Sequence, residues 1–491
     1  MATHTGTLKY EAVQNFINGR FQEEALEALE VHSPLDGTLL TTVPLSTEKT
    51  LHQAVQAAKN ALTEWSAATV KERVQIFYTY RNLLLENLDR LSELICEENG
   101  KTFAEAKAEL EKSVELTEFA CSMPQMVGEE VLEVSRGVEC RMERRPVGVV
   151  ASITPFNFPS MVPHWSIPNA LVLGNTMIVK PSEKVPLSLV EAARLLQKAG
   201  LPDGVLNIVN GDKTIVEAIC DHPDIGAISF VGSTAVAKTV YRRGTSNLKR
   251  VLAMGGAKNH LIVLPDANVA MTATNVIASV TGCAGQRCMA AAAMIAVGNT
   301  EDIIDRICEE ARNMVPGKDI GAVISKAALQ RIENYITQAE EQGAKIRVDG
   351  RGVKIPGREN GYYVGPTVID GVTPDMAIAR EEVFGPVLAI LRSESLKEAI
   401  GIENANPYGN AAAVFTQNGG AAREVINQAG AGMIGVNVGV PVPREPFSFG
   451  GWNESKFGAL DITGKSSIEF WTQLKKITAK WNAEAGINWM S

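Results

Sequence analysis

Strand-like and helix-like segments alternate along the middle of this chain, and this alternation restricts its possible folds more than any other feature. Short apolar and β-branched runs, such as TMIVK at 176–180 and IGAISFV at 225–231, each precede a longer segment with apolar residues three and four positions apart. Strands that alternate with helices in this way are typical of a parallel sheet covered by helices on both faces. The alternation therefore predicts an α/β fold.

The chain is long enough for more than one such unit. A second alternating block follows residue 288, and 491 residues are too many for one hydrophobic core. We expect two α/β domains in tandem, joined near Gly255 and Gly256, with helices over residues 51–120. The segment SSIEFWTQLKKITAKW at 466–481 alternates apolar and polar residues. It predicts an edge strand that another part of the molecule or a second subunit covers.

Composition and charge argue against several classes of partner. Hydrophobic residues make up 45% and charged residues 21% of the chain, as in ordinary globular proteins. The formal net charge of -9 argues against nucleic acid or an anionic membrane as the main partner, because both need a basic surface. The apolar stretch 147–179 is interrupted by prolines and polar residues, so it does not predict a membrane span.

Cysteine usage indicates a reducing compartment. The chain has 7 cysteines, an odd number at low density, which is typical of intracellular proteins rather than of disulfide frameworks. No two cysteines have CxxC spacing and the 6 histidines are scattered, so no metal site is predicted. Residues 1–16 lack the basic region and apolar run of a secretory signal. We expect a cytoplasmic protein.

Two strand-to-helix junctions could hold parts of a nucleotide. FVGST ends a strand and opens a helix, and the free N–H groups of a helix start suit a phosphate near Gly232 and Ser233. IVKPSEKVP places Lys180 and Glu183 at another strand end, the usual place for a ligand in such sheets. Neither motif is specific, because the chain has no GxGxxG fingerprint and a solvated loop explains IVKPSEKVP better when it is taken alone.

Two further segments carry groups suited to catalysis. In ITPFNFPSMVPHW, three prolines stiffen the chain around Asn157, and a fixed side-chain amide is a good donor to a developing oxyanion. In GCAGQRCMAAAAM, at 282–294, Cys288 lies among small residues directly after an arginine. From these residues alone, Cys288 is as consistent with a buried structural cysteine as with a nucleophile.

Six motifs, taken in order, resemble one known family. PFNFP, IVKPSE, FVGST, MGGAKN, GQRC and EEVFGP span nearly the whole chain and are similar to the NAD(P)-dependent aldehyde dehydrogenase superfamily. PFNFPSMVP, and GGAKNH followed by GQRCMA, resemble most the methylmalonate-semialdehyde dehydrogenase branch, whose members transfer the acyl group to coenzyme A. The resemblance implies a homodimer or homotetramer. It also implies a Rossmann-like NAD-binding domain (1–123 and 143–254), an α/β catalytic domain (255–445) and a β-stranded oligomerisation arm (124–142 and 466–491).

The resemblance also implies a role for each matching residue. Cys288 would attack the aldehyde to give a thiohemiacetal and then a thioester, and the amide of Asn157 with the N–H of Cys288 would hold the oxyanion. Cys283 would pack in the helix before the nucleophile. The residues implied for NAD are Thr154, Pro155, Phe156, Lys180, Glu183, Gly232, Ser233, Glu382 and Phe384. Those implied for the aldehyde are Arg287, Lys112, Trp165 and Phe449.

Two of these positions bear on which cofactor and which aldehyde are bound. The carboxylate of Glu183 favours NAD over NADP, because it would repel a 2′-phosphate. The guanidinium of Arg287, beside Cys288, matches a substrate carboxylate. Lys112 stands where the branch has a second arginine, so the positive charge is kept but the planar guanidinium group is lost. His164 stands where an apolar residue is expected. Arg287 favours a small acidic aldehyde like malonate or methylmalonate semialdehyde. The two departures are consistent with neutral drift or with an altered acidic aldehyde that carries a different anionic group.

The base that hydrolytic members use is missing. Those members carry a glutamate before two glycines, and aligning the glycines of LAMGGAKNH places Ala253 at that position. Water without a base is a poor nucleophile, whereas a thiol with a pKa of about 8.5 is partly ionised at neutral pH. The missing base therefore favours acyl transfer to coenzyme A.

Two alternatives remain open from the sequence. One is a hydrolytic NAD-dependent aldehyde dehydrogenase that releases a free carboxylic acid from another anionic aldehyde, with Glu382 as a relocated base. The other is an NAD-binding protein without catalysis, although the intact Cys288 and Asn157 argue against it.

Overall fold

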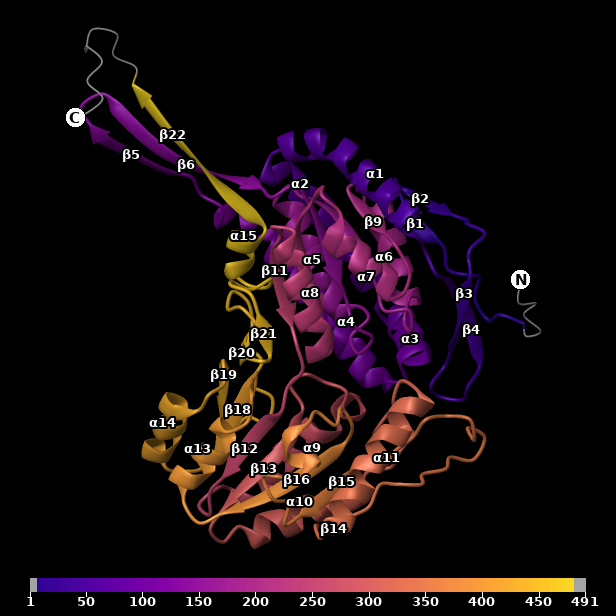
Figure 1. The fold of residues 1–491 in the computed structure, drawn as a ribbon, viewed down its shortest axis with the longest axis vertical. Coiled ribbons are helices and arrows are strands. Elements are labelled where there is room, and N and C mark those ends of the chain that lie inside the picture. Colours follow the sequence, from indigo (N-terminus) through magenta and orange to yellow (C-terminus); the bar gives the residue numbers. More distant parts are fainter. Residues whose placement is uncertain (1–6, 481–491) are drawn as a thin grey trace.

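The structure, a computed structural model, describes residues 7–480. Two large sheets with their helices form the two halves of the molecule, and a narrow strand arm projects from the N-terminal half (Figure 1). The predicted start of the NAD-binding domain at residues 1–6 and the end of the predicted arm at 481–491 lie outside the described residues. The domain limits stay a prediction, but the α/β fold and the two successive sheets match the expectation.

The first sheet has eight strands, in the order β2-β1-β9-β8-β7-β10-β11-β21. The five strands from β9 to β11 are parallel, and the strands at both edges of the sheet are antiparallel to their neighbours. The strands are β1 (Asn15–Ile17), β2 (Arg20–Gln22), β7 (Val149–Ile153), β8 (Thr176–Lys180), β9 (Leu206–Ile208), β10 (Ile225–Val231), β11 (Arg250–Met254) and β21 (Lys456–Phe457).

Eight helices accompany this sheet, and their apolar faces form its core. The spacing of apolar residues over 51–120 predicted helices, and four helices fill that range. Three of these four begin with a threonine whose side chain caps the first turn. The helices are α1 (Glu48–Ala67), α2 (Val70–Glu86), α3 (Leu88–Asn99), α4 (Phe103–Cys121), α5 (Met161–Val172), α6 (Leu187–Lys198), α7 (Lys213–Asp221) and α8 (Thr234–Ser246).

The second sheet has seven strands, in the order β14-β15-β16-β13-β12-β18-β19, and all of its pairings except β14 with β15 are parallel. Its strands are β12 (Asn259–Val263), β13 (Ala291–Val297), β14 (Lys345–Val348), β15 (Thr367–Asp370), β16 (Val387–Ser393), β18 (Ala411–Phe415) and β19 (Met433–Val436). Its helices are α9 (Val269–Thr281), α10 (Glu301–Asn313), α11 (Lys326–Glu341), α12 (Ala377–Arg380), α13 (Leu396–Asn404) and α14 (Gly419–Gln428).

The arm is a three-stranded antiparallel sheet in the order β22-β6-β5 (Figure 1). The predicted C-terminal edge strand is confirmed for β22, but its first part is wrong, because residues 466–470 form the short helix α15. In α15, Ile468 and Trp471 lie three residues apart, so a helical turn buries both side chains on one side. The arm elements are β5 (Glu130–Ser135), β6 (Val138–Pro146), α15 (Ser466–Phe470) and β22 (Thr472–Lys480).

The remaining short elements connect these units. Among the described residues, no helix is both long enough and apolar enough to cross a membrane. The short elements are β3 (Ala28–His32), β4 (Leu39–Pro44), β17 (Tyr408–Gly409), β20 (Trp452–Asn453), and the 3-10 turns η1 (Met123–Gln125) and η2 (Gly282–Gly285).

The parallel strands of the first sheet bring several predicted site segments to one edge. β7 ends before the loop with Asn157, β8 ends within the IVKPSE motif, and β10 ends within the FVGST motif. Because the carboxyl ends of parallel strands meet at the same edge, these segments lie together there. The loop with Cys288 comes from the second half, between η2 and β13, so the candidate site lies where the two halves meet.

Candidate active site

Cys288 is carried by a sharp turn that follows helix α9. The helix ends at Thr281, and Cys283 and Ala284 then take the left-handed backbone conformation, with φ of 53° and 51°. The prediction that Cys283 packs within the helix is therefore wrong, although its side chain is buried. The backbone N–H of Cys283 donates to Oε1 of Glu105 at 2.5 Å. This bond holds a turn that residues with a Cβ adopt only at a cost.

Two asparagines, which the sequence did not single out, hold the backbone at Cys288. The carbonyl of Cys288 accepts from Nδ2 of Asn259 at 2.8 Å and from Nδ2 of Asn410 at 2.9 Å. Asn259 belongs to the MGGAKN motif, which is the signal that could have identified it, whereas nothing in the sequence connects Asn410 with Cys288. The two amides fix the peptide that carries the nucleophile.

The thiol of Cys288 is protonated in this environment. Burial raises the pKa of the Cys288 thiol to about 12, and the negative charge of Glu382 also raises it. Backbone N–H groups and the charge of Arg287 act in the opposite direction but are weaker. A thiolate therefore needs a change in this environment, such as a bound ligand or a proton acceptor.

Asn157 points toward the Cys288 loop. Its Nδ2 donates to the backbone carbonyl of Gln286 at 3.0 Å, while Oε1 of Gln286 accepts from the N–H of Ile324 at 3.1 Å. A side-chain amide has two N–H donors, and no second acceptor for Asn157 occurs among the described residues. The side chain is thus buried and oriented with one donor free for a ligand.

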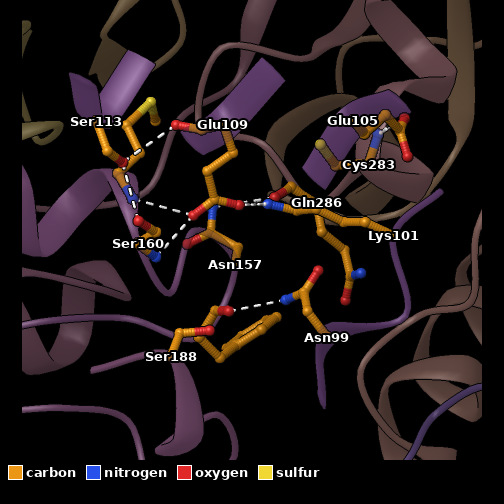
Figure 2. Close-up of polar contacts among 12 residues, drawn as sticks. Asn99, Lys101, Glu105, Glu109, Ser113, Asn157, Ser160, Ser188, Cys283 and Gln286 are labelled. Carbon is orange, nitrogen blue, oxygen red and sulfur yellow. Dashed lines mark hydrogen bonds and ion pairs between the residues drawn. The ribbon is translucent and has the colours of Figure 1, made fainter. Parts of the chain in front are cut away.

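Buried polar side chains from α3 and α4 hold the loop with Asn157 (Figure 2). Asn99 donates to the carbonyl of Phe156 at 2.8 Å, and Oε1 of Glu109 accepts from the N–H of Ser160 at 2.8 Å at the start of α5. The other carboxylate oxygen of Glu109 forms an ion pair with Lys101, and both side chains are fully buried. The ammonium of Lys101 also lies 3.8 Å from the ring centre of Phe158. The neighbours of Asn157 on both sides are therefore tied to one rigid helix pair.

A cleft of about 700 Å³ brings the predicted catalytic and cofactor residues together. Cys288 and Asn157 lie on its wall beside Trp165. All nine residues predicted to bind NAD also lie on it: Thr154, Pro155, Phe156, Lys180, Glu183, Gly232, Ser233, Glu382 and Phe384. No group of acidic, histidine or cysteine side chains that could hold a metal occurs among the described residues.

The groups at one end of this cleft fit a dinucleotide. Nζ of Lys180 lies 3.1 Å from Oε2 of Glu183 at the end of β8. Burial favours the neutral form of Glu183, but the charge of Lys180 and hydrogen bonds outweigh it, so the pKa of this carboxyl lies below its ordinary value. Ser233 is the N-cap of α8, whose first N–H groups face the cleft beside Gly232 and suit a phosphate. An ionised carboxylate and a helix start at this edge suit a ribose and a pyrophosphate.

Glu382 and Phe384 border the same cleft from the second half. Oε1 of Glu382 accepts from the N–H of Ala257 at 3.1 Å, and burial raises the pKa of its carboxyl to about 7. A Cβ at Gly256 would collide with this carboxylate, so a larger residue there would displace the Glu382 side chain. The ring of Phe384 meets that of Phe156 edge to face, with centroids 5.9 Å apart.

A second cavity of about 450 Å³ holds Cys288 together with all four residues predicted for the aldehyde, Lys112, Trp165, Arg287 and Phe449. The rings of Trp165 and Phe449 form an aromatic wall, with centroids 4.7 Å apart. Nη2 of Arg287 donates to the carbonyls of Ala278 and Ser279 at 2.6 and 2.9 Å. Its Nε is shielded from solvent without a hydrogen-bond partner. The side chain borders the cavity and forms no ion pair with a carboxylate among the described residues, so its guanidinium is a candidate for binding a substrate anion.

Lys112 lies in this cavity, but its ammonium is already engaged. Nζ of Lys112 lies 2.6 Å from a carboxylate oxygen of Glu445 and 3.0 Å from one of Glu115. The sequence missed both partners. Glu115 lies three residues further along the same helix, a spacing that could have indicated it, whereas Glu445 is 333 residues away.

The two residues before the glycines supply no base. Ala253, at the aligned position of the base, packs in the core with Val251, whereas Met254 packs in the core that contains Trp165. Neither side chain lines the cleft or the cavity that Cys288 borders. Methionine, like alanine, cannot accept a proton.

His164 has a structural role in the core. Its Nε2 lies 2.8 Å from the hydroxyl of Tyr80 and its Nδ1 lies 2.7 Å from the carbonyl of Ser160. Burial lowers the pKa of His164 to about 4, so the ring is neutral. Both ring nitrogens are satisfied, which explains a histidine where an apolar residue is expected.

Two successive α/β sheets carry a candidate nucleophile, an oxyanion donor and a dinucleotide cleft. This combination defines a class of cysteine-dependent dehydrogenase. Residues 21–477 match the Aldehyde dehydrogenase family, and the chain belongs to this family.

Relatives of this chain cover nearly its full length. An acylating, mitochondrial methylmalonate-semialdehyde/malonate-semialdehyde dehydrogenase from Rattus norvegicus is 43% identical over 96% of this chain and 90% of its own. A malonate-semialdehyde dehydrogenase from Geobacillus kaustophilus is 42% identical over 96% of this chain and 98% of its own. A structure described as methylmalonate-semialdehyde dehydrogenase from Sinorhizobium meliloti, complexed with NAD, is 40% identical with a TM-score of 0.95, covering 97% of this chain and 99% of its own.

Proposed function

We propose that this protein is an NAD-dependent, coenzyme A-acylating dehydrogenase of a small acidic aldehyde, of the malonate or methylmalonate semialdehyde type. One observation carries the acidic substrate. Among the described residues, Arg287 is the cation of the aldehyde cavity that has no carboxylate partner, and it directly precedes Cys288. The relatives from Rattus norvegicus and Geobacillus kaustophilus, named for such semialdehydes, support the assignment.

The residues of the cleft account for the chemistry at the aldehyde carbon. Sγ of Cys288, once deprotonated, bonds to this carbon, while the free amide N–H of Asn157 and the backbone N–H of Cys288 stabilise the oxyanion. NAD, when bound by the nine residues of the cleft, supplies the acceptor for the hydride. Oxidation of the thiohemiacetal leaves a thioester on Cys288. The ionised Glu183 supports NAD over NADP, and a related structure contains NAD.

The release of the acyl group distinguishes the proposed function from its alternative. Ala253 stands at the aligned position of the glutamate, and Met254 beside it is no base either. Water therefore lacks the base that hydrolytic members use, whereas a thiol needs none. Glu382 is the group that keeps hydrolysis as a second candidate. Its carboxyl lies in the same cleft, and its pKa of about 7 suits a general base.

Product analysis tests the proposal. The purified protein is incubated with NAD and malonate semialdehyde, methylmalonate semialdehyde or propanal, with and without coenzyme A, and the products are identified by mass spectrometry. We expect acyl-coenzyme A from the acidic aldehydes and a large drop in NADH formation without coenzyme A. Equal rates without coenzyme A, with a free acid as product, would establish the hydrolytic alternative. The Cys288→Ala variant controls for background oxidation.

The partner and location follow as further proposals. We propose that the arm joins two or four copies of the chain. β5 exposes Val131, Leu132 and Val134, and one edge of β5 and one edge of β22 have no strand partner among the described residues. All seven cysteines are free, which supports a cytoplasmic location. We also propose the domain limits given by the sequence, with 1–123 and 143–254 for NAD and 255–445 for catalysis.

A further inference from the structure

The aldehyde cavity is crossed by an ion pair at its outer end. Arg444 and Glu445 border both the 450 Å³ cavity with Cys288 and an adjoining outer pocket of about 460 Å³. Arg287, next to Cys288, borders only the first of these two spaces. Glu445 therefore lies where the inner cavity meets the outer pocket, farther out than Arg287.

The pair joins two segments on opposite sides of this junction. Lys112 lies on α4, and Glu445 lies on the loop between β19 and β20, with Nζ and Oε2 2.6 Å apart. The side chains are only 19% and 13% exposed, so water screens the pair weakly. Glu115 also contacts Lys112 at 3.0 Å, but it is 41% exposed and does not border the inner cavity.

The charges differ between the two ends of the inner cavity. At the inner end, the guanidinium of Arg287 has no carboxylate partner among the described residues. At the outer end, the ammonium of Lys112 is paired with Glu445 and Glu115, and the guanidinium of Arg444 contacts Glu115 at 3.2 Å. A carboxylate close to the aldehyde carbon meets Arg287, whereas a carboxylate farther out meets Glu445 and cations that already have carboxylate partners. Glu445 disfavours a carboxylate that lies beside it, because like charges repel.

We propose that the Lys112–Glu445 pair sets the length of the acidic aldehyde, so that three-carbon semialdehydes are accepted and longer dicarboxylic semialdehydes are rejected. Glu445 is the specificity-determining residue. The inference rests on the proposed function, because it concerns the substrate of that same cavity.

The experiment compares acidic and neutral aldehydes of two lengths. For each variant, kcat/KM is measured with NAD and coenzyme A for malonate and succinate semialdehyde, and for propanal and butanal. In Glu445→Gln, kcat/KM for succinate semialdehyde divided by kcat/KM for malonate semialdehyde rises by about tenfold. The change is mainly in KM, because a repelling charge is lost and Lys112 is partly freed. The ratio of butanal to propanal stays within about twofold. Glu115→Gln, which removes only the outer partner of Lys112, leaves both ratios unchanged.

A second variant keeps the inference testable if Glu445→Gln does not fold. Lys112→Met leaves the charge of Glu445 uncompensated. The kcat/KM for succinate semialdehyde therefore falls relative to that for malonate semialdehyde. An unchanged ratio in either folded variant overturns the inference, and so does an equal rise for butanal over propanal. If the wild-type protein makes acyl-coenzyme A from malonate semialdehyde, such a result leaves the proposed function standing. If the wild-type protein oxidises neither semialdehyde, the proposed function fails together with the inference.

Discussion

The guanidinium of Arg287 serves the backbone and the cavity at once. Nη2 donates to two carbonyls in the last turn of α9, which places a positive charge at the negative end of the helix dipole. The same side chain crowds Gly282, where a Cβ would collide with the guanidinium. The side chain is thus held at the helix end while it borders the aldehyde cavity.

Replacing Arg287 therefore separates acidic from neutral aldehydes. In Arg287→Gln, kcat/KM for malonate semialdehyde falls by about tenfold or more, because a charged hydrogen bond contributes about 1.5–3 kcal/mol. With propanal, kcat/KM changes by less than about threefold. NADH formation in the presence of coenzyme A measures both. Arg306→Gln, on α10 and away from both the cleft and the aldehyde cavity, is the matched control with no selective effect. An equal loss with propanal would show that Arg287 acts only through the helix end.

Glu382 controls the ionisation of the nucleophile. Its negative charge raises the pKa of the Cys288 thiol, so Glu382→Gln lowers that pKa and increases the thiolate fraction. At pH 8 we expect iodoacetamide to label Cys288 several-fold faster in this variant than in the wild type. Below pH 6 the wild-type carboxyl is itself largely protonated, because its pKa is about 7, so the two rates converge. Peptide mass spectrometry measures the labelling, and equal rates at pH 8 would contradict the assignment.

Helix α4 is the element that connects the parts of the site. Along one face it places Glu105 against the turn before Cys288, Glu109 against the start of α5 and Lys112 against Glu445 (Figure 2 shows the first two). These positions recur every three or four residues, which is the spacing of one helix face. One regular helix thus relates the nucleophile loop, the oxyanion loop and the outer end of the aldehyde cavity.

The buried pair between Lys101 and Glu109 makes this element sensitive to substitution. Lys101→Met leaves the charge of Glu109 buried without its cationic partner, and we expect the free energy of unfolding to fall by about 3–5 kcal/mol. Lys107→Met removes an exposed pair between α4 and Asp89 of α3 and should cost less than about 1 kcal/mol. Urea denaturation followed by fluorescence measures both. A loss below about 1 kcal/mol in Lys101→Met would contradict the structural role of the pair.

At the scale of the whole molecule, two α/β sheets meet at the cleft and an arm leaves the first half (Figure 1). Asn157 lines the cleft from one half, and Cys288 and Glu382 line it from the other. The proposed catalysis therefore depends on how the two halves are positioned relative to each other. The arm buries little of its own apolar surface. Leu132 is 67% exposed and Val131 57%, which is costly for an isolated sheet of three strands.

The mass of the protein in solution tests the proposed role of the arm. We expect the wild-type chain of 52.8 kDa to behave as a dimer or tetramer in light scattering after size exclusion. A variant with Leu132→Lys and Val134→Lys would place charges in the buried interface. We therefore expect its mass in solution to shift toward that of one chain. A charge reversal at the exposed Glu86 on α2 should leave the mass unchanged. A wild-type monomer, or an arm variant with wild-type mass, would contradict the proposal.

Local patterns were sufficient for much of the fold, whereas the predicted cofactor positions came mainly from the family resemblance. The 3.6-residue spacing of 51–120 and the short β-branched runs report directly on helices and strands, because each reflects one buried face. Lys180 and Ser233 stand out without the resemblance only because they lie at strand ends, where parallel strands meet at one edge, and Thr154 was predicted from the family motif alone. Residues 466–470 were misread because a short amphipathic turn and an alternating strand share the same apolar letters.

The sequence by itself determined the α/β class, the order of the motifs and the presence of a cysteine, an amide and an arginine in a family pattern. Only the tertiary structure decided which side chains meet. It turned Cys283 out of the helix, brought Asn410 to the carbonyl of Cys288, and paired Lys112 with Glu445. The physical reason is distance along the chain. Spacing in sequence reports the face of one element, whereas a contact across 333 residues depends on how whole elements pack.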